Sequence, residues 1–441
     1  MYRDLTKGSI SRALVLFALP MMAGNLLQQF YNIADTLIVG RALGANALAA
    51  VGSAYTLMTF LTSIFLGLSM GSGALFSAYL GSGDRDALRA GATHAFALIL
   101  AVTLLLNAAA YLFLEQILTF LRVPGAVRGG MREYLRVIFA GLLATSVYNY
   151  FSCLLRAAGN STAPLVFLAV SAVANVGLDL LFVLAAGWGI AGAAWATVIA
   201  QYAAAAGILV YMLAKCNDLL PKREHLRFNG RILREIVRLS SLTCVQQSVM
   251  NFGILMVQGL VNSFGPAVMA AFAAAVKIDS FAYLPVQDFG NAYSTFVAQN
   301  FGAGNGARIR EGTKKAFLLS AAFSCAVSAL VCAFAAPLMG LFVEADGAAV
   351  VAAGVKYLRI EGACYAGIGC LFLFYGYYRA IQRPAMSVAL TVISLGTRVV
   401  LAYALAGPCG EAGVWAAIPI GWALADLAGL MGMRRREKPR G

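Results

Sequence analysis

Gly44-Ala-Asn-Ala-Leu-Ala-Ala50 recurs, with substitutions, as Gly265-Pro-Ala-Val-Met-Ala-Ala271. The two stretches start 221 residues apart in a chain of 441 residues. The same shift superposes Gly81 and Gly83 on Gly302 and Gly304, then Arg89, Gly91, Ala95 and Phe96 on Arg310, Gly312, Ala316 and Phe317, and finally Gly189 and Gly192 on Gly410 and Gly413. Self-similarity at a fixed period indicates a repeated architecture. The sequence therefore predicts two similar halves.

The composition indicates a membrane protein. Hydrophobic residues make up 61% of the chain and charged residues 12%, whereas soluble domains are nearer to half apolar and a quarter charged. Cutting the chain at clusters of charge, Gly and Pro gives apolar segments long enough to span a bilayer: 12–38, 47–79, 89–113, 131–155, 163–186, 190–213, 233–262, 267–300, 313–337, 352–378, 384–406 and 412–433. We predict an all-α polytopic membrane protein with twelve transmembrane helices in two six-helix lobes.

The number of helices in each half defines the symmetry. Six helices return the chain to its starting side, so the two halves run parallel and a pseudo-two-fold axis lies along the membrane normal. The predicted organisation is an N-terminal lobe at 1–214, a basic cytoplasmic linker at 215–231, a C-terminal lobe at 232–433 and a basic cytoplasmic tail at 434–441. The first apolar run lacks a cleavage pattern, so we expect it to be retained as a helix.

The chain has a net charge of +14, and the distribution of its Lys and Arg residues predicts the topology. The charges lie in the gaps between apolar segments, where Lys and Arg define the cytoplasmic side, so we expect no nucleic-acid binding. With both termini in the cytoplasm, 24 Lys and Arg residues lie inside and seven outside. The cluster from Arg122 to Arg136 is the one predicted outer loop that opposes this topology. We expect a multi-pass protein of the plasma (inner) membrane.

The sequence lacks the patterns of an enzyme or a redox centre. Its eight cysteines form no CxxC pair, it has only two histidines, His94 and His225, and no P-loop motif occurs. We interpret Gly302-Ala-Gly304-Asn-Gly306 as a helix end and turn, because Gly81-Ser-Gly83 lies at the same helix end in the first half. Gly67-x-x-x-Gly71 indicates helix packing. We expect no catalysis and no cofactor other than a bound Na⁺.

Polar residues inside the apolar segments are the candidates for function, because a charge at the centre of a span costs roughly 2.5–3.5 kcal/mol. Asp35 lies in the first segment, and Asn175 and Asp179 lie one helical turn apart on one face of the fifth. Thr197 follows in the sixth segment. Carboxylate, amide and hydroxyl oxygens are the hard ligands that Na⁺ prefers. The pair of carboxylates also suits H⁺, because two carboxylates in one dry site do not both stay ionised.

An alternative for Asp35 and Asp179 is a structural role, in which they cap helix ends or accept hydrogen bonds from nearby backbone. The repeat weakens this alternative. Asp35 falls opposite Met256, and Asp179 falls opposite Arg398 after a small local gap. A structural carboxylate is expected in both halves, whereas an ion site need exist only once.

The second half has its own intramembrane charges. Lys277 and Asp279 are two residues apart and so face different sides of a helix, which leaves open whether they face substrate or form interhelical salt bridges. Aromatic side chains could line a pocket for flat organic cations or only pack. The predicted substrate-cavity residues are Gln28, Tyr31, Lys277, Asp279, Tyr283, Asp288 and Arg398.

Taken in order, these elements resemble the bacterial multidrug and toxic compound extrusion (MATE) transporters over essentially the whole chain. The matching residues are Pro20, Asp35-Thr-x-x-x-Gly40, Gly44-x-x-x-Leu-Ala-Ala50, Arg156-Ala-Ala-Gly-Asn160, Asn175-x-x-x-Asp179, Gly189-x-x-Gly192 and Gln299-Asn-x-Gly-Ala-Gly304. The resemblance implies a V-shaped pair of lobes that alternate access and export drugs against inward H⁺ or Na⁺. It also implies that Asp35, Asn175, Asp179 and Thr197 bind the cation.

A second branch of that family places an acidic residue on the seventh helix. The equivalent stretch here, 243–253, offers only Gln246, Gln247, Ser248 and Asn251, so the resemblance does not extend to a cation site of that type.

The sequence thus predicts a secondary active multidrug efflux transporter, an antiporter of cationic or amphiphilic organic compounds against H⁺ or Na⁺, which we expect to be a monomer. The alternative is a flippase of the same wider superfamily, which acts on lipid-linked oligosaccharides or a related lipid. Such a cavity needs several basic residues to bind a pyrophosphate. Here the apolar segments contain only two basic residues, Lys277 and Arg398, and four acidic ones, Asp35, Asp179, Asp279 and Asp288. An intramembrane lipid transferase would need clustered catalytic carboxylates or histidines, which the sequence does not show.

Overall fold

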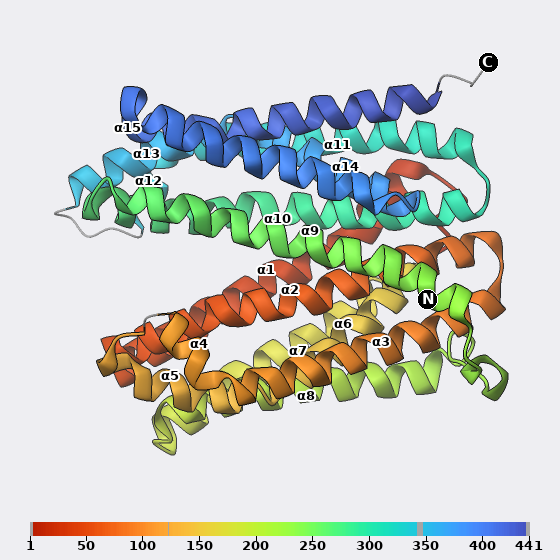
Figure 1. Ribbon diagram of the computed structural model, residues 1–441, viewed down its shortest axis with the longest axis horizontal. Coiled ribbons are helices and arrows are strands. Elements are labelled where there is room, and N and C mark those ends of the chain that lie inside the picture. Colours follow the sequence, from red (N-terminus) through yellow and green to blue (C-terminus); the bar gives the residue numbers. More distant parts are fainter. Residues whose placement is uncertain (1–2, 122, 342–346, 438–441) are drawn as a thin grey trace. The chain divides into compact units, whose positions relative to one another are not determined.

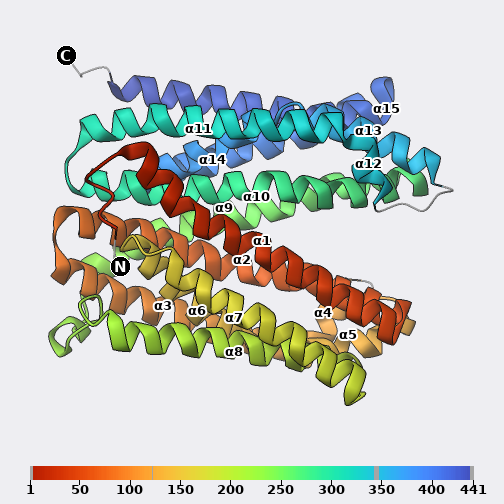
Figure 2. The ribbon, with the colours of Figure 1, turned by 180° about the vertical axis from the view of Figure 1, so that it is seen from behind.

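The computed structural model describes residues 3–121, 123–341 and 347–437. The chain is 89% helical, and the described residues form no strand. Figures 1 and 2 show the helices from two sides. In the first half they are α1 (Ile10–Leu43), α2 (Ala45–Ser82), α3 (Arg85–Leu112), α4 (Leu114–Phe120), α5 (Gly125–Ile138), α6 (Gly141–Ala157), α7 (Thr162–Asp179), the π-helix η1 (Leu180–Ala185) and α8 (Gly189–Lys215). The 3₁₀-helix η2 (Arg223–Leu226) is followed by α9 (Gly230–Asn262), α10 (Pro266–Gly302), α11 (Gly306–Ala333), α12 (Ala335–Gly340), α13 (Ala348–Gly362), α14 (Tyr365–Ala380) and α15 (Pro384–Glu437).

The described helices account for the twelve predicted spans. Nine helices are long and apolar enough to cross a membrane, and two bent helix pairs, α5 with α6 and α13 with α14, each supply one more span. α15 contains two helices, because the backbone at Gly410 is not helical. The protein is therefore an all-α, multi-pass membrane protein.

Two bends were not predicted from the sequence. α5 and α6 meet at 48°, and α13 and α14 meet at 51°. At the first bend, side chains from neighbouring helices donate to backbone carbonyl groups: Asn107 Nδ2 donates to the carbonyl oxygen of Phe139 at 2.8 Å, and the Tyr202 hydroxyl donates to that of Ala140 at 3.0 Å. Such bonds let a membrane helix bend without exposing unpaired backbone to lipid.

The contacts divide the chain into two units. The N-terminal unit contains the described residues up to Asp4 and Leu19–Cys244, and the C-terminal unit contains Leu5–Ala18 and Val245 onward. By its contacts, α1 thus belongs partly to each unit, and Pro20 lies inside it next to the division. The lobe limits predicted above follow the order of the helices along the chain and stay a prediction.

Small residues bring α2 and α9 together within the N-terminal unit. A Cβ atom at Gly71 would lie 2.6 Å from the Cα atom of Ser240, and one at Gly67 would overlap the Cα atom of Cys244. Beside this contact, the hydroxyl groups of Ser72 and Ser240 share a hydrogen bond of 2.9 Å. The packing interpretation of Gly67-x-x-x-Gly71 is therefore confirmed.

The glycine-rich turns also have the predicted structure. Gly83 ends α2 in the left-handed conformation, with φ of 76°, and Gly304 has φ of 68°. The next residue in each turn caps the following helix: Asp84 accepts a hydrogen bond from the backbone N–H of Ala87, and Asn305 accepts one from Arg308. Both motifs are helix ends and N-caps.

The basic linker is anchored to α3 of the N-terminal unit. Arg85 forms an ion pair with Asp218 at 3.2 Å, and His225 Nε2 lies 3.2 Å from Asp86 Oδ1. The backbone N–H of Asn229 donates to His94 Nε2 at 2.9 Å. Both histidines therefore help to hold the linker against α3.

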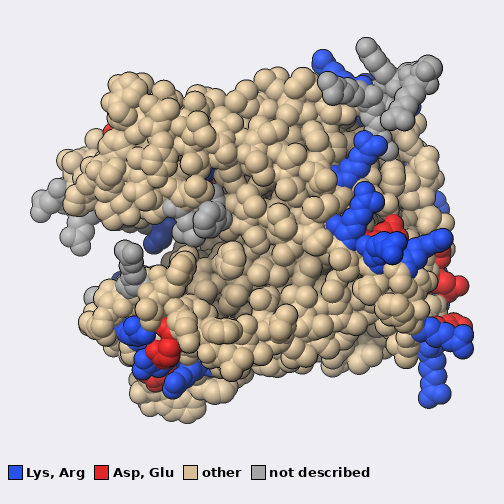
Figure 3. All heavy atoms as spheres, in the orientation of Figure 1, with Lys and Arg blue, Asp and Glu red and all other residues tan. Residues whose placement is uncertain are grey.

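Charges gather at the ends of the helices, and the flanks shown in Figure 3 carry almost none. The predicted outer cluster of arginines is partly neutralised within its own loop. Glu115 on α4 accepts hydrogen bonds from Arg132 and Arg128, and these bonds, the one from Arg132 first, hold the pKa of the Glu115 carboxyl below its usual value. Arg122 lies outside the described residues.

The Gln299-Asn300 motif holds the N-terminal segment in the C-terminal unit. Gln299 Oε1 accepts a hydrogen bond from the backbone N–H of Leu5 at 3.1 Å, and Asn300 Nδ2 donates to the carbonyl oxygen of Leu5 at 3.2 Å. The guanidinium of Arg308 donates to the carbonyl oxygens of Leu5, Lys7 and Gly8. The motif is therefore structural.

Candidate functional site

Two carboxyl groups meet inside the N-terminal unit. Asp35 lies on α1, and Asp179 is the last residue of α7. The two groups are close enough to share a hydrogen bond when one of them carries a proton. Asp179 has none of its surface exposed. The helices therefore bring together two acids that are 144 positions apart in the sequence.

The amide and hydroxyl that the sequence singled out also meet. Asn175 lies one turn before Asp179 on α7 and is 3% exposed. Its Nδ2 atom donates a hydrogen bond to the hydroxyl of Thr197 on α8, with the two atoms 3.3 Å apart. The Thr197 hydroxyl donates in turn to the carbonyl oxygen of Ala193 at 3.1 Å.

The site contains buried oxygen atoms that accept no hydrogen bond. Asn175 Oδ1 is buried and has no hydrogen-bond partner among the described residues, and the same holds for Asp35 Oδ1 and both carboxyl oxygens of Asp179 while both acids are ionised. A buried acceptor without a partner costs about 1–3 kcal/mol, and native proteins pair almost all such atoms. Four of them from only three side chains indicate a place for a proton or a cation.

The donor set fits a small monovalent cation. All the available atoms are oxygens, which suits a hard ion such as Na⁺. Among the described residues no three His, Cys, Asp or Glu side chains gather as they do at a transition-metal site. If Na⁺ is bound, Asp35, Asn175 and Asp179 would hold it with oxygen ligands, and Thr197 would hold the amide of Asn175 in place.

A π-helix begins directly after Asp179. Over η1 the backbone N–H of Ala186 donates to the carbonyl oxygen of Leu181 at 2.8 Å. The rings of Phe182 and Trp188 stack with their centroids 4.5 Å apart, and a Cβ atom at Gly192 would press against both residues. The Gly189-x-x-Gly192 motif thus packs this turn, and π-helical turns are frequent at functional sites.

Tyr134 was missed by the sequence analysis. It lies on α5, is 7% exposed and has Asp35, Asp179 and Tyr31 as electrostatic neighbours. Gln28 and Tyr31 on α1 also interact with each other, and Tyr31 lies near Asp35. Of the predicted cavity residues, Tyr31 therefore lies near the acid pair, and Gln28 lies beside Tyr31.

The C-terminal unit contains a second buried cluster of charges. Asp279 on α10 has Tyr365 of α14 and Arg398 of α15 as its electrostatic partners. Glu361 on α13 interacts with Asp279, Arg398 and Tyr357. Asp279 is 7% exposed and Glu361 is 3% exposed. Asp279 and Arg398 stood out in the sequence, whereas Glu361 did not, because it follows closely on Lys356 and Arg359 and so is not isolated in an apolar run.

The other predicted cavity residues differ in exposure and in their contacts. Lys277 is exposed and Asp279 is buried, as expected for residues two apart on a helix. Asp288 is 3% exposed, farther along α10. The ring of Tyr283 stacks on that of Phe372 with centroids 6.4 Å apart. Gln28 and Tyr31 belong to the N-terminal unit and the other members of the set to the C-terminal unit, and the predicted substrate cavity stays a prediction.

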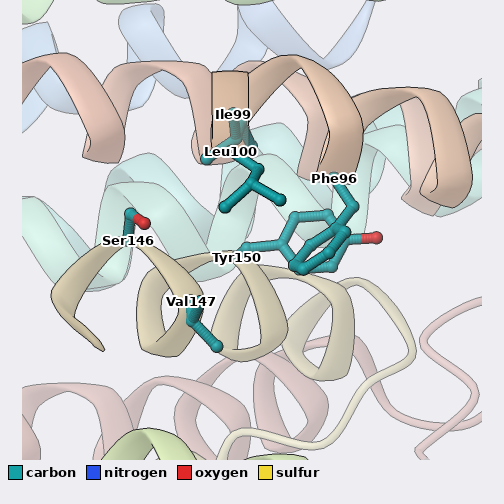
Figure 4. A pocket seen from close by; sticks show the side chains of 6 residues that line it. All are labelled: Phe96, Ile99, Leu100, Ser146, Val147 and Tyr150. Carbon is teal, nitrogen blue, oxygen red and sulfur yellow. The ribbon is translucent and has the colours of Figure 1, made fainter. Parts of the chain in front are cut away.

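A small crevice lies between α3 and α6 of the N-terminal unit (Figure 4). It is too narrow to hold a water molecule. Its lining residues are Phe96, Ile99, Leu100, Ser146, Val147 and Tyr150. The Tyr150 hydroxyl donates to the carbonyl oxygen of Ala92 at 2.7 Å. The crevice is therefore a gap in helix packing, lined by residues other than the predicted site residues.

The chain is similar to known transporters along most of its length. The MatE family profile matches it twice, at residues 20–181 and 243–404. A probable multidrug resistance protein, YpnP of Bacillus subtilis, is 30% identical over 89% of this chain and 87% of its own. A probable multidrug resistance protein, NorM of Thermotoga maritima, is 26% identical over 76% of this chain and 72% of its own.

A solved structure has the same fold. It is described as the outward-facing conformation of a multidrug resistance MATE family transporter, and it superposes with a TM-score of 0.93 at 22% identity, over 98% of this chain and 97% of that one. The two profile matches start 223 residues apart, close to the shift of the internal repeat. The repeat, the twelve spans and both profile matches agree: the chain belongs to the MatE family of multidrug and toxic compound extrusion transporters.

Proposed function

We propose that this transporter is a secondary active antiporter, which exports cationic or amphiphilic organic compounds in exchange for H⁺ or Na⁺ by alternating access of its two lobes. The observation that carries the proposal is the set of buried oxygens on Asp35, Asn175 and Asp179, which have no partner among the described residues. Such a set can hold one proton or one small cation and release it.

The acid pair can couple the two fluxes through charge. When both carboxyl groups are ionised, the site carries two negative charges in a region of low dielectric, which is unfavourable. One bound H⁺ or Na⁺, or a cationic drug nearby, relieves this repulsion. Because the same charge attracts all three, the binding of the ion weakens the binding of the drug.

The relatives support the drug class. YpnP and NorM are named as probable multidrug resistance proteins.

Lys and Arg concentrate in the segments that the topology assigns to the cytoplasm, which supports cytoplasmic termini in the plasma (inner) membrane. We expect the monomer to be the transporting unit.

The test is dye transport into inside-out membrane vesicles under one imposed gradient at a time. We expect a fluorescent organic cation to accumulate when the lumen is acidic or rich in Na⁺, and to leave when an ionophore collapses that gradient. Transport that needs ATP and neither gradient would contradict the proposal. Transport of a lipid-linked oligosaccharide, with no response of the dye, would favour the flippase.

A further inference from the structure

The linker between α8 and α9 has one packed side and one exposed side. Cys216, Leu219 and His225 are buried against the N-terminal unit. Leu226 and Phe228, in contrast, are 61% and 78% exposed. Because the buried side chains hold the segment in place, these two residues form an apolar surface that the described part of the N-terminal unit does not cover.

Contacts with α3 define how far the linker extends along that helix. His225 Nε2 lies 3.2 Å from Oδ1 of Asp86, in the first turn of α3. The ring of Phe228 lies beside that of His94, with the centroids 6.0 Å apart. Asp86 and His94 are eight residues apart, which is about 12 Å along a helix axis. Phe228 therefore lies beside the part of α3 that follows Arg89, the last Asp, Glu, Lys or Arg of that helix.

Basic side chains flank the two exposed apolar ones. The stretch 222–234 contains five Lys and Arg residues and one acidic residue, Glu224. Arg223, Arg227 and Arg231 are exposed, and within the described part of the chain none of the three forms an ion pair with an acidic side chain. Apolar side chains between unpaired arginines are typical of a segment that lies in the membrane interface and attracts anionic lipid.

We propose that the linker segment 222–231 binds anionic phospholipids of the adjacent membrane leaflet. Leu226 and Phe228 enter the boundary between headgroups and acyl chains, and Arg223 and Arg227 bind the lipid phosphate groups. Because α8 and α9 both span the membrane, the segment that joins them is held near the lipid and loses little translational freedom on binding. Lipid binding thus fixes the linker at the membrane surface beside α3.

The test uses the full-length protein with Phe228→Trp in lipid nanodiscs. The wild type has four tryptophans, so the fluorescence of the new one is taken as the difference from the wild type. The discs contain phosphatidylglycerol and phosphatidylcholine in equal amounts, with bromine on the acyl chains of one or the other as a short-range quencher. We expect brominated phosphatidylglycerol to quench the added fluorescence about twofold more than brominated phosphatidylcholine, because nearby arginines favour anionic lipid.

Charge variants check the cause of this preference. Removing two arginines of the segment, with Arg223→Gln and Arg227→Gln together, should abolish the difference between the two lipids. The matched control is Arg310→Gln with Lys314→Gln, two exposed basic residues on α11 of the C-terminal unit, and it should leave the difference unchanged. Inorganic phosphate added to the discs, with potassium chloride of equal ionic strength as its reference, should also leave it unchanged.

Four results would overturn the proposal. Quenching by neither lipid would place position 228 in water, and equal quenching by both would exclude a preference for anionic lipid. A difference that survives the loss of Arg223 and Arg227 would exclude their role. A difference that inorganic phosphate abolishes would identify the free anion, and not the lipid, as the ligand.

Leu226→Trp provides a second reporter on the same surface, with the same expected results, if Phe228→Trp does not fold. The experiment leaves Asp35 and Asp179 intact and measures no transport. Its outcome is therefore independent of whether that pair couples drug export to H⁺ or to Na⁺.

Discussion

The amide nitrogen of Asn175 donates a hydrogen bond to the hydroxyl of Thr197, 3.3 Å away. The Thr197 hydrogen is itself used on the carbonyl oxygen of Ala193, so the hydroxyl is held as an acceptor. This arrangement fixes the orientation of the Asn175 amide and leaves its Oδ1 atom free. Thr197 is therefore a positioning residue, and Asn175 supplies the oxygen.

This arrangement predicts the effect of Thr197→Val. The change keeps the shape and removes the acceptor, so the amide is no longer oriented. A net hydrogen bond is worth about 1 kcal/mol, which corresponds to roughly a fivefold change in an equilibrium constant. We expect the apparent affinity for the coupling ion to fall about fivefold in vesicle transport, while Thr197→Ser stays near wild type. Equal losses in both variants would contradict the positioning role.

Asp35→Asn should abolish gradient-driven efflux. The substitution keeps the size and most of the polarity of the side chain and removes its negative charge, so the site no longer attracts the coupling ion. Dye transport in vesicles is the measurement, normalised to the amount of folded protein. The matched control is Glu311→Gln, an exposed acid paired with Lys315 on the same helix surface, where a surface ion pair is worth little. Efflux at the wild-type rate in Asp35→Asn would exclude Asp35 from coupling.

Asp35→Asn and Asp179→Asn should be non-additive. Because the two carboxyl groups share one site, either substitution alone disables it, and the double variant should be no worse than the single ones. Transport rates of all four proteins complete the cycle. Independent, multiplicative losses would indicate two separate sites.

Drug binding should weaken as the pH falls. Protonation removes negative charge from the acid pair, so a cationic drug is held less tightly in acid, and lower external pH should favour its release from the outward-open state. The measurement is the affinity of the purified protein for a cationic dye between about pH 5 and 8. An affinity that is constant, or that increases in acid, would exclude proton competition at Asp35 and Asp179.

Gly71→Ile should destabilise the N-terminal unit. A Cβ atom at Gly71 would lie 2.6 Å from the Cα atom of Ser240, and backbone does not yield as a side chain does. Overpacking of this kind costs typically about 1–3 kcal/mol, which should lower the melting temperature in detergent. Gly52→Ala on the same helix is the matched control, because a Cβ atom there meets nothing within 4 Å. Equal melting temperatures would contradict close packing of α2 on α9.

Much of the architecture was predictable because it depends on local sequence. Apolar runs such as 163–186 and 190–213 must become helices in a bilayer, where every backbone group needs a partner within its own segment, and the described helices match these runs within a few residues. The repeat of Gly44–Ala50 at Gly265–Ala271 similarly predicted two halves, and the two profile matches agree with it. The turns at Gly83 and Gly304 were predictable because a left-handed residue there favours glycine.

The candidate site was predictable only as a set of residue types. Asp35, Asn175, Asp179 and Thr197 stand out in the sequence because polar groups are costly inside apolar helices. Their contacts did not follow from that cost, since no spacing rule connects α1 with α7. Tyr134 and Glu361 gave no comparable signal: tyrosine is common in membrane helices, and Glu361 follows closely on Lys356 and Arg359, so it is not isolated in an apolar run.

The sequence by itself determined the number of spans, the two-fold repeat and which polar residues are too costly to be incidental, because each of these properties depends on hydropathy or period along the chain. Only the tertiary structure decided which of them meet. In the structure Asp35 lies beside Asp179, and the Asn175 amide donates a hydrogen bond to Thr197. Arg398 lies among the acids of the C-terminal unit. The physical reason is that a buried charge is stabilised by partners from other helices, and the packing of those helices, with its bends and glycine contacts, sets the distances.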